Sequence, residues 1–235
     1  MKLIYITGID GCGKTTQSKM LTDYLIEHGT NAQYQWLRWS PSIGKLISQI
    51  KKNNVKVKIE KLAATDNCTQ MIENKTFVKW ADFKRRVFSS EVFRFVWSKY
   101  ATWDYYFAYK KSCSSWNSEV IVLDRYYFDF IVDQSLNYEE SPEKFESRIE
   151  GGVLKNVKKP DVFILIDITP EMGWDRKRDG TSMTHLRKLH VSYNSIKSEK
   201  SVYVIDGSMS PELVRDEIIN IIKELNLSSG GGYVV

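Results

Sequence analysis

The sequence has few cysteines, no long apolar run and no dense basic tract. Its three cysteines, Cys12, Cys68 and Cys113, lack the spacing of a metal site and favour a reducing, cytoplasmic setting. No stretch approaches the roughly 20 apolar residues of a membrane span, and a strand-like run follows Met1 at once, so we expect no membrane span and no signal peptide. The net charge of +5 is modest and not concentrated in tracts, so we expect no nucleic-acid partner.

The 235 residues suffice for one α/β domain with a sizeable core. Helical stretches, among them Thr16–His28 and Pro211–Leu225, alternate with five apolar runs that have the pattern of strands buried on both faces. This alternation predicts a three-layer α/β fold, in which a five-stranded parallel sheet is covered by helices on both faces. The five runs are Lys2–Thr7, Ala32–Trp39, Glu119–Asp124, Asp161–Ile168 and Ser201–Asp206.

We expect residues 1–227 to form a single domain, followed by a flexible Ser/Gly-rich tail at 228–235. The connection between the second and third predicted strands is about 80 residues long, and it contains an insertion at approximately 50–90. The insertion begins with Lys51–Lys61, where Lys alternates with Val and Ile. That pattern is compatible with a hairpin arm or with the end of a basic helix.

The segment Gly8–Thr15 fits the pattern of a phosphate-binding loop, in which two glycines five residues apart are followed by Lys and Thr. Glycines let such a loop turn its N–H groups toward phosphate oxygens, and the helix N-terminus adds partial positive charge. Lys14 can reach the β- and γ-phosphates, while the Thr15 hydroxyl can bind Mg²⁺, so we predict ATP and Mg²⁺ as cofactors. The predicted nucleotide-binding residues are Gly8, Gly11, Cys12, Gly13, Lys14, Thr15 and Thr16, with Cys12 interpreted as a small filler rather than a nucleophile.

The third predicted strand ends in Asp124-Arg125-Tyr126. An acidic residue at the carboxyl end of a buried strand beside the phosphate loop can help to hold Mg²⁺, so Asp124 joins Thr15 as a predicted metal-binding residue. The guanidinium of Arg125 offers two parallel donors for a second phosphate. An ion pair at the strand end is the alternative interpretation.

A dense set of aromatic residues occupies Phe83–Lys111. Their three- and four-residue spacing is typical of a helix packed in a core. They nevertheless occur on both sides of such a helix, so some must face a cleft, a partner or a lipid surface. The residues are Phe88, Phe93, Phe95, Trp97, Tyr100, Trp103, Tyr105, Tyr106, Phe107 and Tyr109.

Taken together, these segments resemble the thymidylate kinase family of P-loop nucleoside monophosphate kinases. The similar segments are Ile6–Gln17, Asp124–Tyr126 with Gln134 ten residues after Asp124, Pro160–Glu171 and Val202–Gly207. The resemblance covers nearly the whole chain. It implies a P-loop kinase fold, a nucleotide as small-molecule substrate and a homodimer.

The resemblance also implies roles for individual residues. Asp10 would contact the sugar hydroxyl of the phosphoryl acceptor, and Arg38 would grip the acceptor phosphate. Arg125 would bridge the acceptor and donor phosphates.

A lid that closes over ATP is implied at approximately 174–187. Because Cys12 replaces the loop arginine found in some family members, the arginine that stabilises the transferred phosphoryl group should come from this lid. Arg176 and Arg178 are the catalytic candidates, and Arg187 is a further one. A basic helix end is the alternative interpretation of Arg176 and Arg178.

The acceptor-base site departs from the family pattern. Family members usually carry Phe, followed four residues later by Arg, about 20 residues before the Asp-Arg-Tyr segment. At that spacing this chain has Tyr100 and Asp104, whereas a shifted register gives Phe95 and Lys99. The predicted acceptor-binding set is Asp10, Arg38, Tyr100, Asp104 and Gln134.

The predicted function is ATP-dependent phosphorylation of a nucleoside monophosphate, with dTMP as the first choice. A kinase of the same fold acting on another nucleotide, a sugar phosphate or an envelope precursor is the first alternative. It is favoured by Asp104 and by Asp129, which stands where the family typically has Ser, because acidic groups prefer amino or hydroxyl partners to a thymine carbonyl. A non-enzymatic, nucleotide-dependent interaction protein is the second alternative. The predicted catalytic residues are Lys14, Arg125, Arg178 and Arg176.

Overall fold

The computed structural model describes residues 1–42, 86–177, 181–197 and 201–225 of the 235-residue chain. The expected insertion at approximately 50–90 therefore lies almost wholly outside the described residues, as do Lys51–Lys61, Arg178 and the tail at 228–235.

The described residues contain a five-stranded, all-parallel sheet in the order β2-β3-β1-β4-β5. The five predicted strands are confirmed, and β1 has the predicted bounds. The second strand ends three residues earlier than predicted, because its partner β3 ends at Asp124, which lies opposite Trp36. The strands are β1 (Lys2–Thr7), β2 (Ala32–Trp36), β3 (Val120–Asp124), β4 (Val162–Asp167) and β5 (Val202–Asp206).

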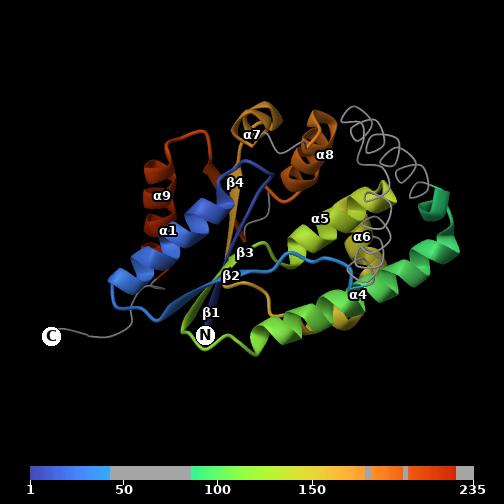
Figure 1. The fold of residues 1–235 in the computed structure, drawn as a ribbon, viewed down its shortest axis with the longest axis horizontal. Helices are drawn as coiled ribbons and strands as arrows, with labels where there is room; N and C mark the ends of the chain where they lie inside the picture. The colour runs from blue at the N-terminus through green and yellow to red at the C-terminus, as the bar shows by residue number, and fades with distance from the viewer. Residues whose placement is uncertain (43–85, 178–180, 198–200, 226–235) are drawn as a thin grey trace, which may run out of the picture.

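The central strands are buried because helices cover both faces of the sheet. α1 (Lys14–Glu27) packs against α9 (Pro211–Glu224) on one side, which is the left side in Figure 1. On the other side lie α4 (Glu91–Cys113), α5 (Tyr127–Tyr138) and α6 (Pro142–Ile149). The predicted three-layer arrangement is thus confirmed, and the continuous apolar runs of β1, β3 and β4 supply its core.

Local sequence explains where most helices start. Five begin after a Ser or Thr whose hydroxyl accepts the backbone N–H three residues later, which satisfies one donor of the open first turn. Three of these have Pro at the start of the first turn, where its fixed φ fits and its missing N–H costs nothing. The capping residues are Ser90 (α4), Ser141 (α6), Thr169 (α7, Pro170–Arg176), Ser182 (α8, Met183–Asn194) and Ser210 (α9).

From Glu91 onward the aromatic segment forms α4, and the aromatic side chains of this helix divide between core and surface as the sequence predicts. Tyr105 is buried and stacks on Phe130 of α5, with 4.7 Å between the ring centroids. Phe95, Trp103 and Phe107 are exposed on the same helix. In the described ranges, no helix is long and apolar enough to cross a membrane.

The sheet register brings two functional segments together. β1 pairs with β3 so that Ile6 lies opposite Asp124. The loop after β1, Gly8–Gly13, and the turn after β3, Arg125–Tyr126, therefore leave the carboxyl edge of the sheet side by side. In open α/β sheets this edge is where ligands bind.

Candidate phosphate-binding site

The loop between β1 and α1 is packed tightly against β4 and α7. Gly8 and Gly11 both have positive φ, at 145° and 88°. A Cβ on Gly8 would collide with the carbonyl oxygen of Ile166, and one on Gly11 would collide with the carbonyl oxygen of Gly173. Only glycine satisfies both constraints, which explains the glycine pattern of the loop.

Lys14 begins α1 and turns back over the loop. Its ammonium donates to the carbonyl oxygen of Ile9 at 3.0 Å and lies 3.5 Å from the Asp10 carboxylate. Cys12 is buried within the loop, and burial raises the pKa of its thiol. A buried, protonated thiol fits the interpretation of Cys12 as a filler.

Thr15 and Asp124 form a pair that suits Mg²⁺. The Thr15 hydroxyl donates to Asp124 Oδ2 at 2.6 Å, and the Tyr34 hydroxyl donates to the same oxygen at 3.0 Å. Asp124 Oδ1 is buried with no hydrogen-bond partner among the described residues, so one carboxylate oxygen is available as a ligand. Mg²⁺ prefers such oxygen donors and usually completes its shell with water and substrate phosphates, so the residues present fit this ion.

The described residues contain no group of three or more His, Cys, Asp or Glu side chains that could hold a metal ion. A site of one hydroxyl and one carboxylate is in keeping with that finding, because Mg²⁺ in phosphoryl-transfer sites is bound largely by phosphate oxygens.

Arg125 is held between two carboxylates. One terminal nitrogen, Nη2, donates to Asp10 Oδ1 at 2.5 Å, and Nη1 donates to Asp129 Oδ1 at 3.3 Å. Burial by itself would lower the pKa of Arg125, but Asp129 and Asp10 outweigh burial and raise it. Arg125 also has a φ of 68°, in the left-handed region that is costly for a residue with a side chain. The fold therefore keeps a strained residue at this position.

Asp10 is surrounded by positive charge. Burial alone would raise its pKa, but Lys14, Arg125 and Lys177 together lower it to about 2. Lys177 follows α7, and its ammonium lies 3.6 Å from the Asp10 carboxylate. This carboxylate therefore links the phosphate loop, the turn after β3 and the end of α7.

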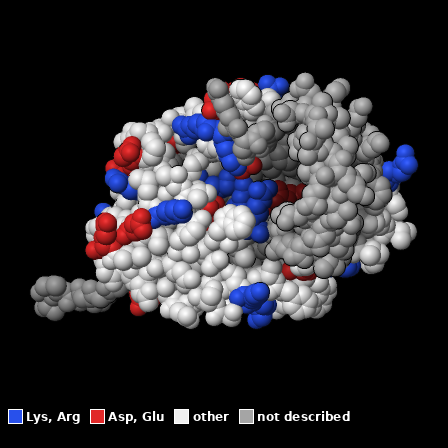
Figure 2. Space-filling view, in the orientation of Figure 1, with Lys and Arg blue, Asp and Glu red and all other residues white. Residues whose placement is uncertain are grey.

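These side chains surround a cavity of about 380 Å³ at the carboxyl edge of the sheet. Figure 2 shows Lys and Arg side chains gathered near the middle of this face, beside a hollow with acidic side chains. Five basic residues and one acidic residue line the cavity, a balance that suits a polyanionic phosphate ligand. The lining residues are Asp10, Gly11, Gly13, Lys14, Thr15, Thr16, Trp36, Arg38, Arg125, Arg176 and Lys177.

Two predicted arginines reach this cavity from its sides. Arg38 follows β2, has a side chain that is 43% exposed, and lies 4.0 Å from the Asp133 carboxylate. Arg176, at the end of α7, donates to the carbonyl oxygen of Gly207 at 2.8 Å. Arg187 does not line the cavity: it is on α8, is exposed and donates to Glu171 at 3.0 Å.

Three of the predicted acceptor-binding residues, Tyr100, Asp104 and Gln134, do not line the cavity either. Asp104 accepts from the indole N–H of Trp39 at 2.9 Å and from the backbone N–H of Ser42 at 3.1 Å. Its carboxylate therefore anchors the segment after β2. The buried Gln134 accepts from the indole N–H of Trp97 at 3.0 Å, and the Tyr100 ring lies 5.4 Å from that indole ring.

Sequence reasoning missed three contributors to the site. Asp133 faces Arg38, and desolvation raises the pKa of its carboxyl group. Lys177 pairs with Asp10, and Tyr193 contacts Asp129, which the sequence marked only as a departure from the family pattern. The spacing of Asp129 and Asp133 could have indicated that both carboxylates face the site, because residues four apart lie on the same face of a helix.

The architecture defines the class of protein. A solved structure of deoxyadenosine kinase from M. mycoides with bound dCTP aligns with a TM-score of 0.51 at 15% identity, covering 95% of this chain and 100% of that chain. This likeness shows the P-loop kinase fold. No protein-family model matches the sequence.

Proteins that are similar to this chain in sequence include thymidylate kinases. The thymidylate kinase of Thermoanaerobacter sp. (strain X514) is 26% identical over 243 residues, covering 95% of this chain and 98% of the relative. A probable thymidylate kinase of Archaeoglobus fulgidus is 26% identical over 233 residues, covering 96% and 97%. The chain is thus similar to thymidylate kinases along nearly its whole length, which confirms the resemblance seen in the motifs.

The charge around Asp10 predicts a pH-dependent stability. The pKa of Asp10 is lowered in the folded state, so its ionised form contributes stability above about pH 4, and this contribution is lost as the pH falls toward 2. We expect Asp10→Asn to lower the free energy of unfolding by about 2 kcal/mol at pH 7, and by progressively less between pH 4 and 2. Urea unfolding across this pH range measures the difference.

The matched control is Asp216→Asn on α9, where the carboxylate pairs with the neighbouring Arg215 at the surface. It should change stability by less than about 0.5 kcal/mol. A difference between the natural protein and Asp10→Asn that stays constant from pH 7 to pH 2 would contradict the prediction.

Proposed function

We propose that the protein is a kinase, formed as a single domain of residues 1–227, that transfers the γ-phosphoryl group of ATP to a nucleoside monophosphate, with dTMP as the acceptor. The observation that carries this proposal is the cavity lined by the phosphate loop, Thr15 and Arg125, with Asp124 hydrogen-bonded to the Thr15 hydroxyl behind it. The similarity to thymidylate kinases along nearly the whole chain supports a nucleotide kinase. The scattered cysteines fit action in the cytoplasm.

The phosphate loop and α1 would hold the donor phosphates. Backbone N–H groups of the loop and the N-terminus of α1 provide donors and partial positive charge for them. Lys14 would exchange the carbonyl oxygen of Ile9 for oxygens of the β- and γ-phosphates. Thr15 and Asp124 would hold Mg²⁺, which neutralises phosphate charge when bound.

The acceptor phosphate would lie between Arg38 and Arg125. It is already an anionic nucleophile, so the reaction needs no strong base, and catalysis consists of positioning and charge neutralisation. Arg125 is suited to bridge two phosphates, because its planar guanidinium presents several donors in a fixed geometry. Asp10 would accept a hydrogen bond from the acceptor's sugar hydroxyl.

A lid formed by approximately 174–187 would place an arginine beside the transferred phosphoryl group, where its charge stabilises that group. Arg176 is the candidate within the described residues, because it lines the cavity and its guanidinium donates there to the carbonyl oxygen of Gly207. Arg178 remains the second candidate.

A second acceptor class is favoured by one observation. The Asp133 carboxylate is 27% exposed and lies beside Arg38, where the acceptor would bind. An acidic group there suits an amino or hydroxyl substituent better than a carbonyl oxygen. The alternative is therefore a kinase of the same fold that phosphorylates another small acceptor.

The proposed reaction predicts ADP release that depends on both ATP and dTMP. In a coupled assay, Arg125→Ala should lower kcat by roughly 10³-fold, because a bridging positive charge is lost from the transition state. Arg215→Ala on the surface of α9 is the matched control and should retain full turnover. ATP turnover with other nucleotides or phosphosugars but none with dTMP would favour the second acceptor class.

Arg176 and Arg187 lie near the two ends of the expected lid, and we expect their replacement by Ala to have different effects on kcat. Arg176→Ala should lower kcat by roughly 10³-fold if it supplies the charge-stabilising arginine. Arg187→Ala should change kcat less than threefold, because Arg187 lies outside the cavity and pairs with Glu171 at the surface. Full turnover of Arg176→Ala would transfer this role to Arg178.

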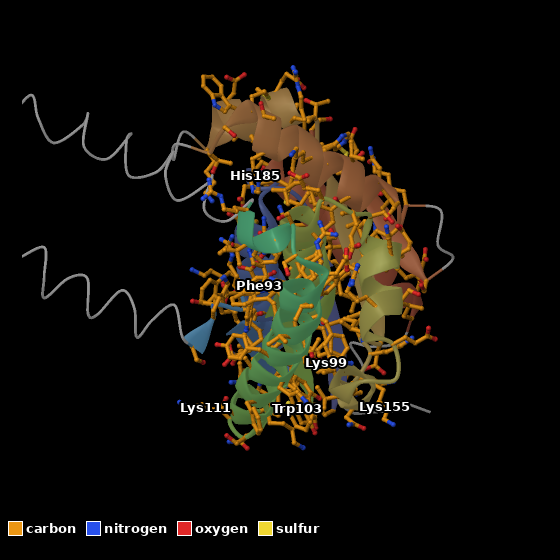
Figure 3. The ribbon with its side chains drawn as sticks, turned by 90° about the vertical axis from the view of Figure 1, so that its right-hand side faces the viewer. Phe93, Lys99, Trp103, Lys111, Lys155 and His185 are labelled. Atoms are coloured by element: carbon orange, nitrogen blue, oxygen red, sulfur yellow. The ribbon has the colours of Figure 1, made fainter. Side chains whose placement is uncertain are left out.

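We further propose that two copies associate through α4. Its outward face carries Val92, Val96, Trp103 and Phe107, whose spacing places them along one side of the helix. Trp103 and Lys99 are labelled on this helix in Figure 3. A two-fold axis beside α4 would bury the apolar face of each copy against the other.

The dimer predicts twice the mass of one chain in light scattering after size-exclusion chromatography. Phe107→Asp should shift the mass to that of one chain, because it places two negative charges in the shared apolar contact. Val191→Asp, at an exposed position on α8, should leave the mass unchanged. A single-chain mass for the unaltered protein at micromolar concentration would refute the dimer.

A further inference from the structure

We infer that Asp129 is the positioning residue for Arg125, and that Tyr193 of α8 shares this role through the same carboxylate. The inference rests on the proposed function, because it assigns the groups that aim the bridging arginine. Asp129 lies in the first turn of α5 and is 3% exposed.

The Asp129 carboxylate accepts five hydrogen bonds. Oδ1 accepts from the Tyr193 hydroxyl at 2.7 Å, from the Thr7 hydroxyl at 3.0 Å and from Arg125 Nη1 at 3.3 Å. Oδ2 accepts from the Tyr5 hydroxyl at 2.5 Å and from the backbone N–H of Tyr126 at 2.9 Å. Both oxygens are thus fully used.

These donors come from three separate parts of the fold. Tyr5 and Thr7 belong to the central strand β1, and Tyr193 belongs to α8. Arg125 and the N–H of Tyr126 belong to the turn between β3 and α5. The carboxylate therefore ties this turn to the centre of the sheet and to α8.

The network requires a carboxylate at this position. An ionised carboxylate only accepts hydrogen bonds, so it can serve five donors at once. An amide of the same shape would turn an NH₂ group toward some of these donors and would remove the negative charge beside Arg125.

Burial raises the pKa of both the Tyr5 and the Tyr193 phenols, and the Asp129 charge raises them further. The two hydroxyls therefore remain protonated donors around neutral pH. They hold the carboxylate in place through contacts that do not involve Arg125.

Two fixed carboxylates define the orientation of the Arg125 guanidinium. Asp129 binds Nη1 and Asp10 binds Nη2, so both ends of the planar group are anchored. Without Asp129 the side chain keeps one anchor and recovers rotation about the long Arg stem. A displacement of about 1 Å in such a group can lower a rate roughly 10²-fold.

A double-mutant cycle tests whether Asp129 acts through Arg125. With ATP and dTMP, Asp129→Asn should lower kcat roughly 10²-fold and change KM for ATP less than threefold, because the phosphate loop is untouched. In an Arg125→Ala background, adding Asp129→Asn should lower kcat less than threefold further. Equal fold-losses in both backgrounds would show a merely structural role and overturn the inference.

Two further variants separate positioning from loss of a buried hydrogen bond. Tyr193→Phe keeps the carboxylate but removes one of its donors, and it should lower kcat about tenfold while KM for ATP stays within threefold. Tyr138→Phe removes another buried hydroxyl on α5, one that donates to the carbonyl oxygen of Arg94 at 2.7 Å. It should leave kcat unchanged, and an equal loss in both Phe variants would overturn the inference. Tyr193→Phe also serves if Asp129→Asn does not fold.

A crystal structure of nucleotide-free Asp129→Asn provides a readout that does not depend on activity. We expect the Arg125 guanidinium to leave its place beside position 129 and to rotate about its remaining contact with Asp10, while β1 and the phosphate loop keep their places. An unmoved guanidinium would overturn the inference. If the unaltered protein phosphorylates no nucleotide, the proposed function fails, whereas this structural readout still decides the role of Asp129.

Discussion

The site depends on one buried guanidinium. A charge of this kind is costly in a protein interior unless opposite charges and hydrogen bonds compensate it. Asp10 and Asp129 supply Arg125 with opposite charge and with hydrogen bonds. Each of these carboxylates is itself held by further groups. Lys14 and Lys177 surround Asp10, while hydroxyls from β1 and α8 surround Asp129. Through this chain of pairings, the strained turn after β3 is connected to the phosphate loop, the central strand and two helices.

Backbone geometry brings those charges within reach of one another. The pairing of β1 with β3 places the two functional turns next to each other at the carboxyl edge of the sheet. Gly8 and Gly11 then allow the phosphate loop to contact the backbone of β4 and α7 directly. α7 in turn delivers Arg176 and Lys177 to the same cavity. Five basic side chains from four segments of the chain thus line one cavity, an excess of positive charge that suits a polyanionic ligand.

The predicted strands agree with the structure because their burial is encoded locally, in runs such as Lys2–Thr7 and Val162–Asp167 that are apolar on both faces. The end of β2 was misjudged because it depends on the length of β3, its partner. Asp104 illustrates the same limit within the site. The family resemblance made it a predicted acceptor contact, and its spacing from Asp124 did not indicate its hydrogen-bond partners Trp39 and Ser42, which lie more than sixty residues earlier in the chain. Spacing along the sequence specifies a position on a helix and not the partner that the side chain meets.

The sequence by itself determined the phosphate loop, the order of strands and helices, and the acid and arginine that follow one another at the end of the third strand. These features are local, because each follows from residues that are neighbours in the chain. Only the tertiary structure decided which carboxylates hold Arg125, that Lys177 faces Asp10, and that Arg187 lies outside the cavity. These contacts join residues far apart in the sequence, such as Thr7, Asp129 and Tyr193. Their partners are chosen by strand register and helix packing, which no single segment encodes.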